Sequence, residues 1–128
     1  MSNVDHPAHY NLNRSGIEAI VVCEMLSFNL GNAFKYVVRR EHKGDRRENI
    51  EKAIWYAKRE MARWEAAGFN EGGPSAKNYP KVRTDATKMA NCDSQPFDRI
   101  LVCLATAASA RDGRDRLAEA IKLLESVR

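Results

Sequence analysis

Basic residues, with several aromatic residues among them, are concentrated between Ala33 and Arg63, and this stretch holds the side chains that are the best candidates for a functional site. It holds ten Lys or Arg residues against five Asp or Glu residues, a local charge of +5 in a chain whose total is +4. Lys and Arg form charge-assisted hydrogen bonds with phosphate oxygens. Tyr and Trp rings offer surfaces on which a base can stack. The pattern favours a site for a phosphorylated nucleoside, although a solvated helical surface would show the same charges.

Helical spacing would gather these groups on two neighbouring helices. Lys35 and Arg39 are four residues apart and share a face with Asn32, one turn earlier. The flanking and facing residues of the pair of helices complete the candidate set. They are Tyr36, Arg40, Lys43, Lys52, Trp55, Tyr56, Arg59 and Arg63.

The N-terminal arm contains two histidines, His6 and His9, three residues apart. Pro7 lies between them and prevents the helical geometry that would direct both at one ion. Because no Cys or carboxylate cluster completes a site, we expect no bound metal. A hydrogen bond from a histidine to a phosphate or a base is one role for this arm, and simple surface exposure is the alternative.

The usual phosphate-binding motifs are absent from the sequence. There is no GxxxxGK[ST] loop and no GxGxxG turn, and no pair of acids is placed to hold magnesium. Three cysteines without a CxxC pair predict neither a zinc site nor a disulfide framework, and Cys23 and Cys103 are expected in the core. We expect no cofactor. Any phosphoryl transfer from ATP would depend on positioning and on cationic stabilisation.

The apolar periodicity predicts a mainly α fold. Length and composition, 128 residues with 44% hydrophobic residues, are typical of one domain. Helices are expected over about 17–26, 30–42, 45–67, 97–110 and 112–127. Asp45 is expected to cap the third, in a capping box with Glu48, and Gly68 to end it. Two helical hairpins would be joined by a long loop, with an extended N-terminal arm before them.

The predicted loop covers residues 68–95, which are rich in Gly and Pro and have no sustained apolar period. A short strand or helical turn near 79–83 is the most regular structure expected there. The single domain would therefore consist of a helical half (4–67), this loop (68–95) and a C-terminal hairpin (96–128).

Location and assembly follow from the same composition. No apolar run approaches the roughly 20 residues of a membrane helix, and the polar N-terminus does not resemble a signal peptide. We therefore expect a cytoplasmic protein without a membrane partner. Trp64, Phe69 and Tyr79 suggest surface for self-association as a homodimer or a larger closed assembly.

Four pieces of the N-terminal half match a known pattern in order and spacing: DHPAHY (5–10), GIEAI (16–20), FNLGNAFKYVVRR (28–40) and, after Lys43, ENIEKAIWY (48–56). Over about residues 4–64 the chain resembles a family of small tailed-phage proteins of formerly unknown function that is described as nucleotide-kinase-like. The resemblance implies a helical, nucleotide-related protein in the cytoplasm of an infected bacterium. Carried over by position, it indicates as ligand-binding residues His6, Pro7, His9, Tyr10, Asn32, Lys35, Tyr36, Arg39, Lys43, Lys52, Trp55 and Tyr56.

Three functions remain open at this stage. The resemblance implies a deoxynucleoside monophosphate kinase that works without a Walker loop or a metal, in which Lys35 or Arg39 would stabilise the transferring group. A binding protein could instead sequester a cyclic oligonucleotide or an ADP-ribose-type signal of host anti-phage defence, with no chemistry. A nucleic-acid or host-protein binder ranks last, because acidic residues interrupt the basic face. They are Glu41, Glu48, Glu51 and Glu60.

Overall fold

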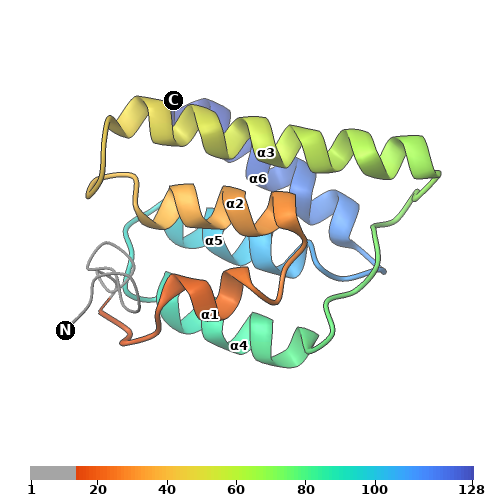
Figure 1. Cartoon of the computed structure of the whole chain (residues 1–128), viewed down its shortest axis with the longest axis horizontal. Helices are drawn as coiled ribbons and strands as arrows, with labels where there is room; N and C mark the ends of the chain where they lie inside the picture. The colour runs from red at the N-terminus through yellow and green to blue at the C-terminus, as the bar shows by residue number, and fades with distance from the viewer. Residues whose placement is uncertain (1–13) are drawn as a thin grey trace.

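The computed structural model describes residues 14–128, which form six helices and no strand (Figure 1). The predicted mainly helical class is therefore confirmed. The arm residues His6, Pro7, His9 and Tyr10 lie outside the described part of the chain. The helices are α1 (Ala19–Cys23), α2 (Phe28–Val38), α3 (Arg46–Ala67), α4 (Tyr79–Ala90), α5 (Phe97–Thr106) and α6 (Gly113–Val127).

α2 and α3 form the predicted antiparallel hairpin, and local side chains set its ends. The Ser27 hydroxyl accepts a hydrogen bond from the Leu30 amide at the start of α2. The Asp45 carboxylate caps α3, and Gly68, with a φ of 77°, ends it as expected. Glu48 forms an ion pair with Lys52, so the capping box is replaced by an i, i+4 pair.

The prediction of a continuous loop over residues 68–95 is wrong, because α4 lies within it. Val82, Ala86 and Met89 follow one another at helical spacing and are fully buried. Pro80 lies in the first turn, where a missing amide hydrogen costs no helical hydrogen bond. The polar residues between these apolar positions make the helical spacing difficult to recognise in the sequence. The irregular segments shrink to residues 69–78 and 91–96.

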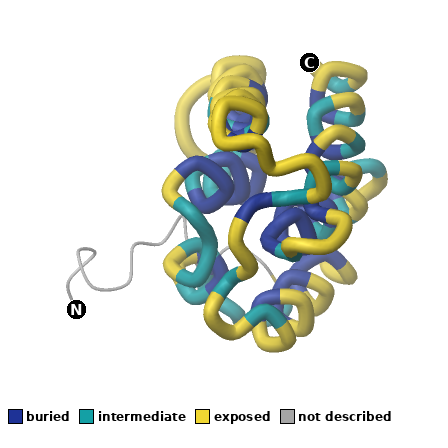
Figure 2. The backbone as a smooth tube through the Cα atoms, turned by 90° about the vertical axis from the view of Figure 1, so that its right-hand side faces the viewer, coloured by how far each residue is buried: buried dark blue, intermediate teal, exposed yellow. Residues whose placement is uncertain are grey.

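One hydrophobic core joins all six helices. α5 packs against α2, α4 and α6, and its Ile100 and Leu104 are completely buried. Phe34 of α2 and Leu117 of α6 are buried in the same cluster. Figure 2 shows the buried segments turned towards this shared interior and the exposed ones on the outside. The N-terminal and C-terminal halves are thus packed together rather than linked by a free loop.

Trp64 does not provide the self-association surface that we expected from it. Its side chain is only 4% exposed. The chain turns back after Gly68, where the Phe69 amide bonds to the Trp64 carbonyl, and Gly73 then lies against the indole. A Cβ at Gly73 would be 2.2 Å from Trp64 Nε1, so only glycine permits this approach.

None of the helices in residues 14–128 combines the length and apolar character needed to cross a membrane.

Candidate functional site

Two tyrosines join α2 to α3 at the centre of the candidate site. The rings of Tyr36 and Tyr56 are stacked, with centroids 6.0 Å apart and planes inclined by 12°. Both side chains pack against the edge of the hydrophobic core. The remaining functional groups are arranged around this pair.

Three cations surround the ring of Tyr36. The distances to its centroid are 4.4 Å from Lys35 Nζ, 4.9 Å from Arg39 Cζ and 5.4 Å from Lys52 Nζ. Each such contact is worth about 0.5–1 kcal/mol at an exposed site. Lys52 is also paired with Glu48 at 3.2 Å. Within residues 14–128, Lys35 and Arg39 have no carboxylate partner, so the surface around Tyr36 attracts anions.

Arg39 has, in addition, an unsatisfied donor. Its Nε is buried and has no hydrogen-bond partner in the described part of the chain. Buried polar groups are almost always hydrogen-bonded, and a charged one that is not carries a cost. The Nε of Arg40, which belongs to the ion pair with Asp93, is buried and unpartnered in the same way, so this feature is not specific to the candidate site.

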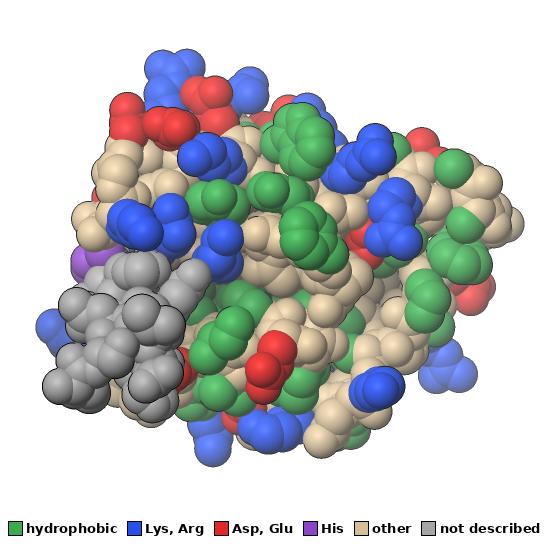
Figure 3. All heavy atoms as spheres, viewed as in Figure 1, with side chains coloured by type: hydrophobic (Ala, Val, Ile, Leu, Met, Phe, Trp, Pro, Cys, Tyr) green, Lys and Arg blue, Asp and Glu red, His purple; other side chains and the backbone are tan. Residues whose placement is uncertain are grey.

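Two exposed rings extend the tyrosine pair to the surface. Phe28 is 74% exposed and Trp55 is 60% exposed. Both meet Tyr56 edge-on, at centroid distances of 6.0 Å and 5.1 Å respectively. Figure 3 shows hydrophobic and basic side chains side by side over α2 and α3. We call this surface the aromatic–cation cluster; it consists of Phe28, Lys35, Tyr36, Arg39, Lys52, Trp55 and Tyr56.

A hollow of about 280 Å³ between α1 and α2 adjoins the cluster. Gly31 brings the two helices close, because a Cβ there would lie 2.8 Å from the Cys23 carbonyl oxygen. Asn32 is held by its own amide, which donates to the Phe28 carbonyl at 2.8 Å, and its oxygen accepts from Lys35 Nζ at 3.1 Å. The residues that line this α1–α2 hollow are Ile20, Cys23, Glu24, Ser27, Phe28, Gly31, Asn32 and Lys35.

The thiol in this hollow is not a nucleophile at neutral pH. Burial raises the pKa of Cys23 to about 12, and the nearby charge of Lys35 opposes that rise only in part. A thiol attacks as the thiolate, which this environment disfavours. No group of three or more His, Cys, Asp or Glu side chains within residues 14–128 is arranged to hold a metal ion.

The structure brings together seven of the predicted site residues: Asn32, Lys35, Tyr36, Arg39, Lys52, Trp55 and Tyr56. Lys43 lies exposed in the turn after α2 and Arg59 lies exposed further along α3; neither lines the hollow. His6, Pro7, His9 and Tyr10 lie outside the described residues.

Sequence reasoning missed Phe28 and Gly31. Phe28 follows the capping residue Ser27 and falls outside the buried stripe formed by Leu30, Phe34 and Val37. An apolar residue off the stripe of an amphipathic helix is a signal of exposure that was available in the sequence. The role of Gly31 depends on the approach of α1, which has no local signal.

Two charged residues were wrongly placed on the basic face. Arg40 is buried, with both terminal nitrogens on Asp93 at 2.8 and 3.1 Å and its guanidinium 3.6 Å from the centroid of the Phe97 ring. Glu60 is only 2% exposed and accepts hydrogen bonds from Ser27 and Asn29 of the α2 start. Both hold helices together, since a buried charge needs partners.

Comparison with known proteins gives one match. Residues 4–58 match a family described as a protein of unknown function (DUF3310). The matched stretch includes α1, α2 and the part of α3 that carries Lys52, Trp55 and Tyr56, and it ends before Arg59. The N-terminal part of the chain is thus similar to this family, whose description names no activity. No curated protein and no solved structure matches the chain.

Proposed function

We propose that this protein binds a phosphorylated nucleoside at the aromatic–cation cluster. The observation that carries the proposal is the placement of Lys35, Arg39 and Lys52 around one tyrosine ring, next to two rings that are exposed to solvent. Phosphates need cationic donors and a base needs a flat apolar surface. The cluster offers both within a few ångströms.

The phosphate would lie against Lys35 and Arg39. Neither has a carboxylate partner in the described residues, so neither must break an ion pair to bind an anion. Lys52 would contribute less, because Glu48 already neutralises it.

The base would lie against Phe28 or Trp55, or enter the α1–α2 hollow beside them. Stacking of a base on an aromatic side chain is worth about 1–3 kcal/mol and tolerates different bases. The hollow, at about 280 Å³, is close to the lower end of the usual range for ligand pockets, about 300–1,000 Å³. It suits a base or a sugar rather than a whole dinucleotide.

Two activities are compatible with such binding. The resemblance to nucleotide-kinase-like phage proteins supports phosphoryl transfer from ATP to a deoxynucleoside monophosphate, with Lys35 and Arg39 stabilising the transferring group. One feature of the cluster favours sequestration of a nucleotide signal of host defence instead. Within residues 14–128 the cluster itself contains cations and rings but no carboxylate. Glu48, beside it, is bound to Lys52, and Glu24 in the adjoining hollow is the carboxylate that remains as a candidate general base.

Binding can be measured through Trp55, since Trp55 and Trp64 are the two tryptophans of the chain. In a Trp64→Phe variant, Trp55 alone reports, and deoxynucleoside monophosphates, ATP, ADP-ribose and cyclic dinucleotides would be titrated in turn. We expect at least one to quench it. Lys35→Gln and Arg39→Gln should each weaken binding about tenfold or more, whereas Arg83→Gln, which removes an exposed charge on α4, should not.

The fate of the ligand separates the two activities. Chromatography after incubation with ATP gives a nucleoside diphosphate if the protein is a kinase, and intact ligand if it only sequesters. Calorimetry on the unmodified chain provides a check that does not depend on Trp64→Phe. If no nucleotide of the panel binds at millimolar concentration in either experiment, the proposal is wrong.

A further inference from the structure

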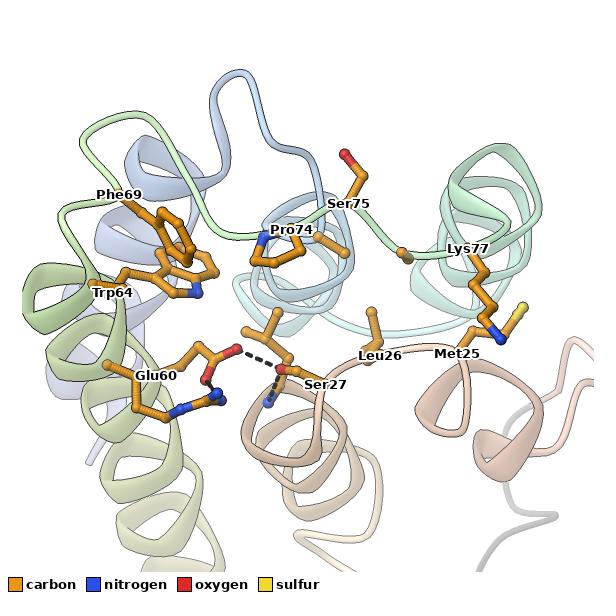
Figure 4. A pocket seen from close by; sticks show the side chains of 14 residues that line it. Met25, Leu26, Ser27, Glu60, Trp64, Phe69, Pro74, Ser75 and Lys77 are labelled. Atoms are coloured by element: carbon orange, nitrogen blue, oxygen red, sulfur yellow. Dashed lines mark hydrogen bonds and ion pairs between the residues drawn. The ribbon is translucent and has the colours of Figure 1, made fainter.

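A second cavity, of about 550 Å³, lies towards the C-terminal end of α3 (Figure 4). Its walls come from the turn between α1 and α2, the last two turns of α3 and the segment 69–77 that returns over the end of that helix, together with Leu30 of α2 and Ala108 after α5. We call it the Trp64 cavity. Its volume lies within the range of small-molecule sites.

The outer wall of the Trp64 cavity is held in place by hydrogen bonds to the C-terminal half. The Ala76 amide donates to the Ala108 carbonyl at 2.9 Å, and the Arg114 amide donates to the Glu71 carbonyl at 2.8 Å. Between them, Gly73 lies against the Trp64 indole. The segment is therefore fixed at both ends and in the middle, which indicates that the cavity is formed before any ligand enters.

The lining is apolar over most of its surface. Leu30 and Trp64 are buried beneath it, and Phe69 is 38% exposed above them. Figure 4 shows Trp64 and Phe69 on one side of the cavity and Lys77 on the other, where it extends towards Met25. Two aromatic rings on one wall suit a flat apolar group.

The charges at the cavity are unequal. The carboxylate of Glu60 is buried and accepts hydrogen bonds from Ser27 Oγ at 2.5 Å, Asn29 Nδ2 at 3.1 Å and Arg63 Nη1 at 2.9 Å. Arg63 is 59% exposed and gives Glu60 one of its nitrogens. Lys77 is exposed as well. The Glu60 carboxylate is thus already hydrogen-bonded by three donors, whereas Arg63 and Lys77 both have N–H groups that are still available. This excess of donors favours an anion at the mouth of the cavity.

We propose that the Trp64 cavity binds a small organic monoanion, separately from the aromatic–cation cluster. Its flat apolar body lies against Trp64 and Phe69, and its acidic group pairs with Arg63 on the same side, while the charge of Lys77 on the opposite side adds to the attraction at the mouth (Figure 4). The site takes one molecule, and its preference is for a single negative charge on an aromatic or similarly flat body.

Two dyes that differ by one acidic group test this proposal. The anionic probe is 8-anilinonaphthalene-1-sulfonate and the uncharged one is N-phenyl-1-naphthylamine. In a Trp55→Phe variant the fluorescence comes from Trp64 alone, so energy transfer to a bound dye reports binding from a single donor, and the cavity-filling variant described below shows whether the dye lies in this cavity. We expect transfer to both dyes at one-to-one stoichiometry, with the sulfonate bound more tightly.

Variants of the mouth and of the lining decide the result. Arg63→Gln and Lys77→Gln should each weaken sulfonate binding about two- to fivefold, the range for exposed ion pairs, without affecting the uncharged dye. Ala67→Phe, which fills the cavity, should weaken both dyes. Arg83→Gln, whose side chain does not line the cavity, is the charge-matched control, and circular dichroism checks that each variant is folded.

The proposal is overturned if Trp64 transfers no energy to either dye. It is also overturned if Arg63→Gln and Lys77→Gln leave the preference for the sulfonate unchanged, because the anion would then lie elsewhere. Either result leaves nucleotide binding intact, since that is measured at Trp55 with Trp64 replaced.

Discussion

Tyr36 and Tyr56 lie face to face, 6.0 Å apart, across the boundary between α2 and α3. Each has further partners: cations gather around Tyr36, and exposed rings meet the edge of Tyr56. The pair therefore serves the packing of the hairpin and the shape of the candidate site at once. Changing either ring should affect both stability and binding.

Comparing Tyr56→Ala with Tyr56→Phe should distinguish the contribution of the ring from that of the hydroxyl group. Aromatic contacts contribute about 0.5–1.5 kcal/mol each beyond the area they bury, so Tyr56→Ala should lower the free energy of unfolding by about 2–4 kcal/mol. Nucleotide affinity should fall as well. Tyr56→Phe keeps the ring and should retain most of both. Urea denaturation and calorimetry provide the measurements, and equal behaviour of the two variants would contradict the role given to the ring.

Glu60 should contribute much more to stability than the other acidic residues of α3. Its carboxylate is buried and accepts three hydrogen bonds, so Glu60→Gln turns at least one acceptor into a donor that faces donors. We expect a loss of about 1–3 kcal/mol in the free energy of unfolding. The control is Glu48→Gln, because Glu48 is 62% exposed and its pair with Lys52 should be worth less than about 1 kcal/mol. If both variants lose the same amount, Glu60 is not the anchor described above.

Gly31→Ala tests the approach of α1 to α2. Alanine usually stabilises a helix by about 1 kcal/mol relative to glycine. Here the new Cβ would lie 2.8 Å from the Cys23 carbonyl oxygen, which is backbone and cannot rotate away. We expect the strain to exceed the gain, with a net loss of about 1–2 kcal/mol and a change in the α1–α2 hollow that weakens nucleotide binding. A higher melting temperature in this variant would show that the helices separate without cost.

The three cysteines should differ sharply in reactivity. Burial raises the pKa of Cys23 to about 12 and that of Cys103 to about 11, from an ordinary value of 9.0, whereas Cys92 is exposed. At pH 8 a thiol reagent should modify one cysteine rapidly and the other two much more slowly, because their thiolates are disfavoured. Modification followed by peptide mass spectrometry should identify Cys92; rapid labelling of Cys23 would contradict the burial described for it.

The same shifts give stability a definite pH dependence. Both pKa values are raised in the folded state, so the folded protein keeps protons that the unfolded chain releases. The contribution of the neutral thiols is complete below about pH 9 and is lost as the pH rises through about 11 and 12. Urea titrations of the wild type and of Cys23→Ala at increasing pH should show a shallower decline in the variant.

Local signals allowed α3 to be predicted from end to end. Asp45, the apolar period from Ile50 to Trp64, and Gly68 all lie within the helix or at its ends. α4 also has local signals, but Pro80 and the polar residues around Val82 and Ala86 are equally typical of a loop, so the helix was not predicted. A proline just before apolar residues spaced four apart, as Pro80 stands before Val82 and Ala86, is a signal for the start of a helix.

The burial of charges could not be predicted in the same way. Arg40 pairs with Asp93, 53 residues along the chain, and Glu60 bonds to Ser27 across 33 residues. In sequence these charges resemble Lys52 and Glu48, which are exposed. The meeting of Tyr36 with Tyr56 follows from the hairpin, whereas the position of Phe69 beside the Trp64 cavity depends on how residues 69–77 return over α3.

Ser27 belongs to the walls of both the α1–α2 hollow and the Trp64 cavity, and its hydroxyl is bonded to Glu60 and to the Leu30 amide. Two occupants of these neighbouring spaces would touch the same residue. If either one displaces Ser27, the affinity of the other changes, and thermodynamic linkage requires the change to be equal in both directions. The hydroxyl of Ser27 would therefore couple binding at one site to binding at the other.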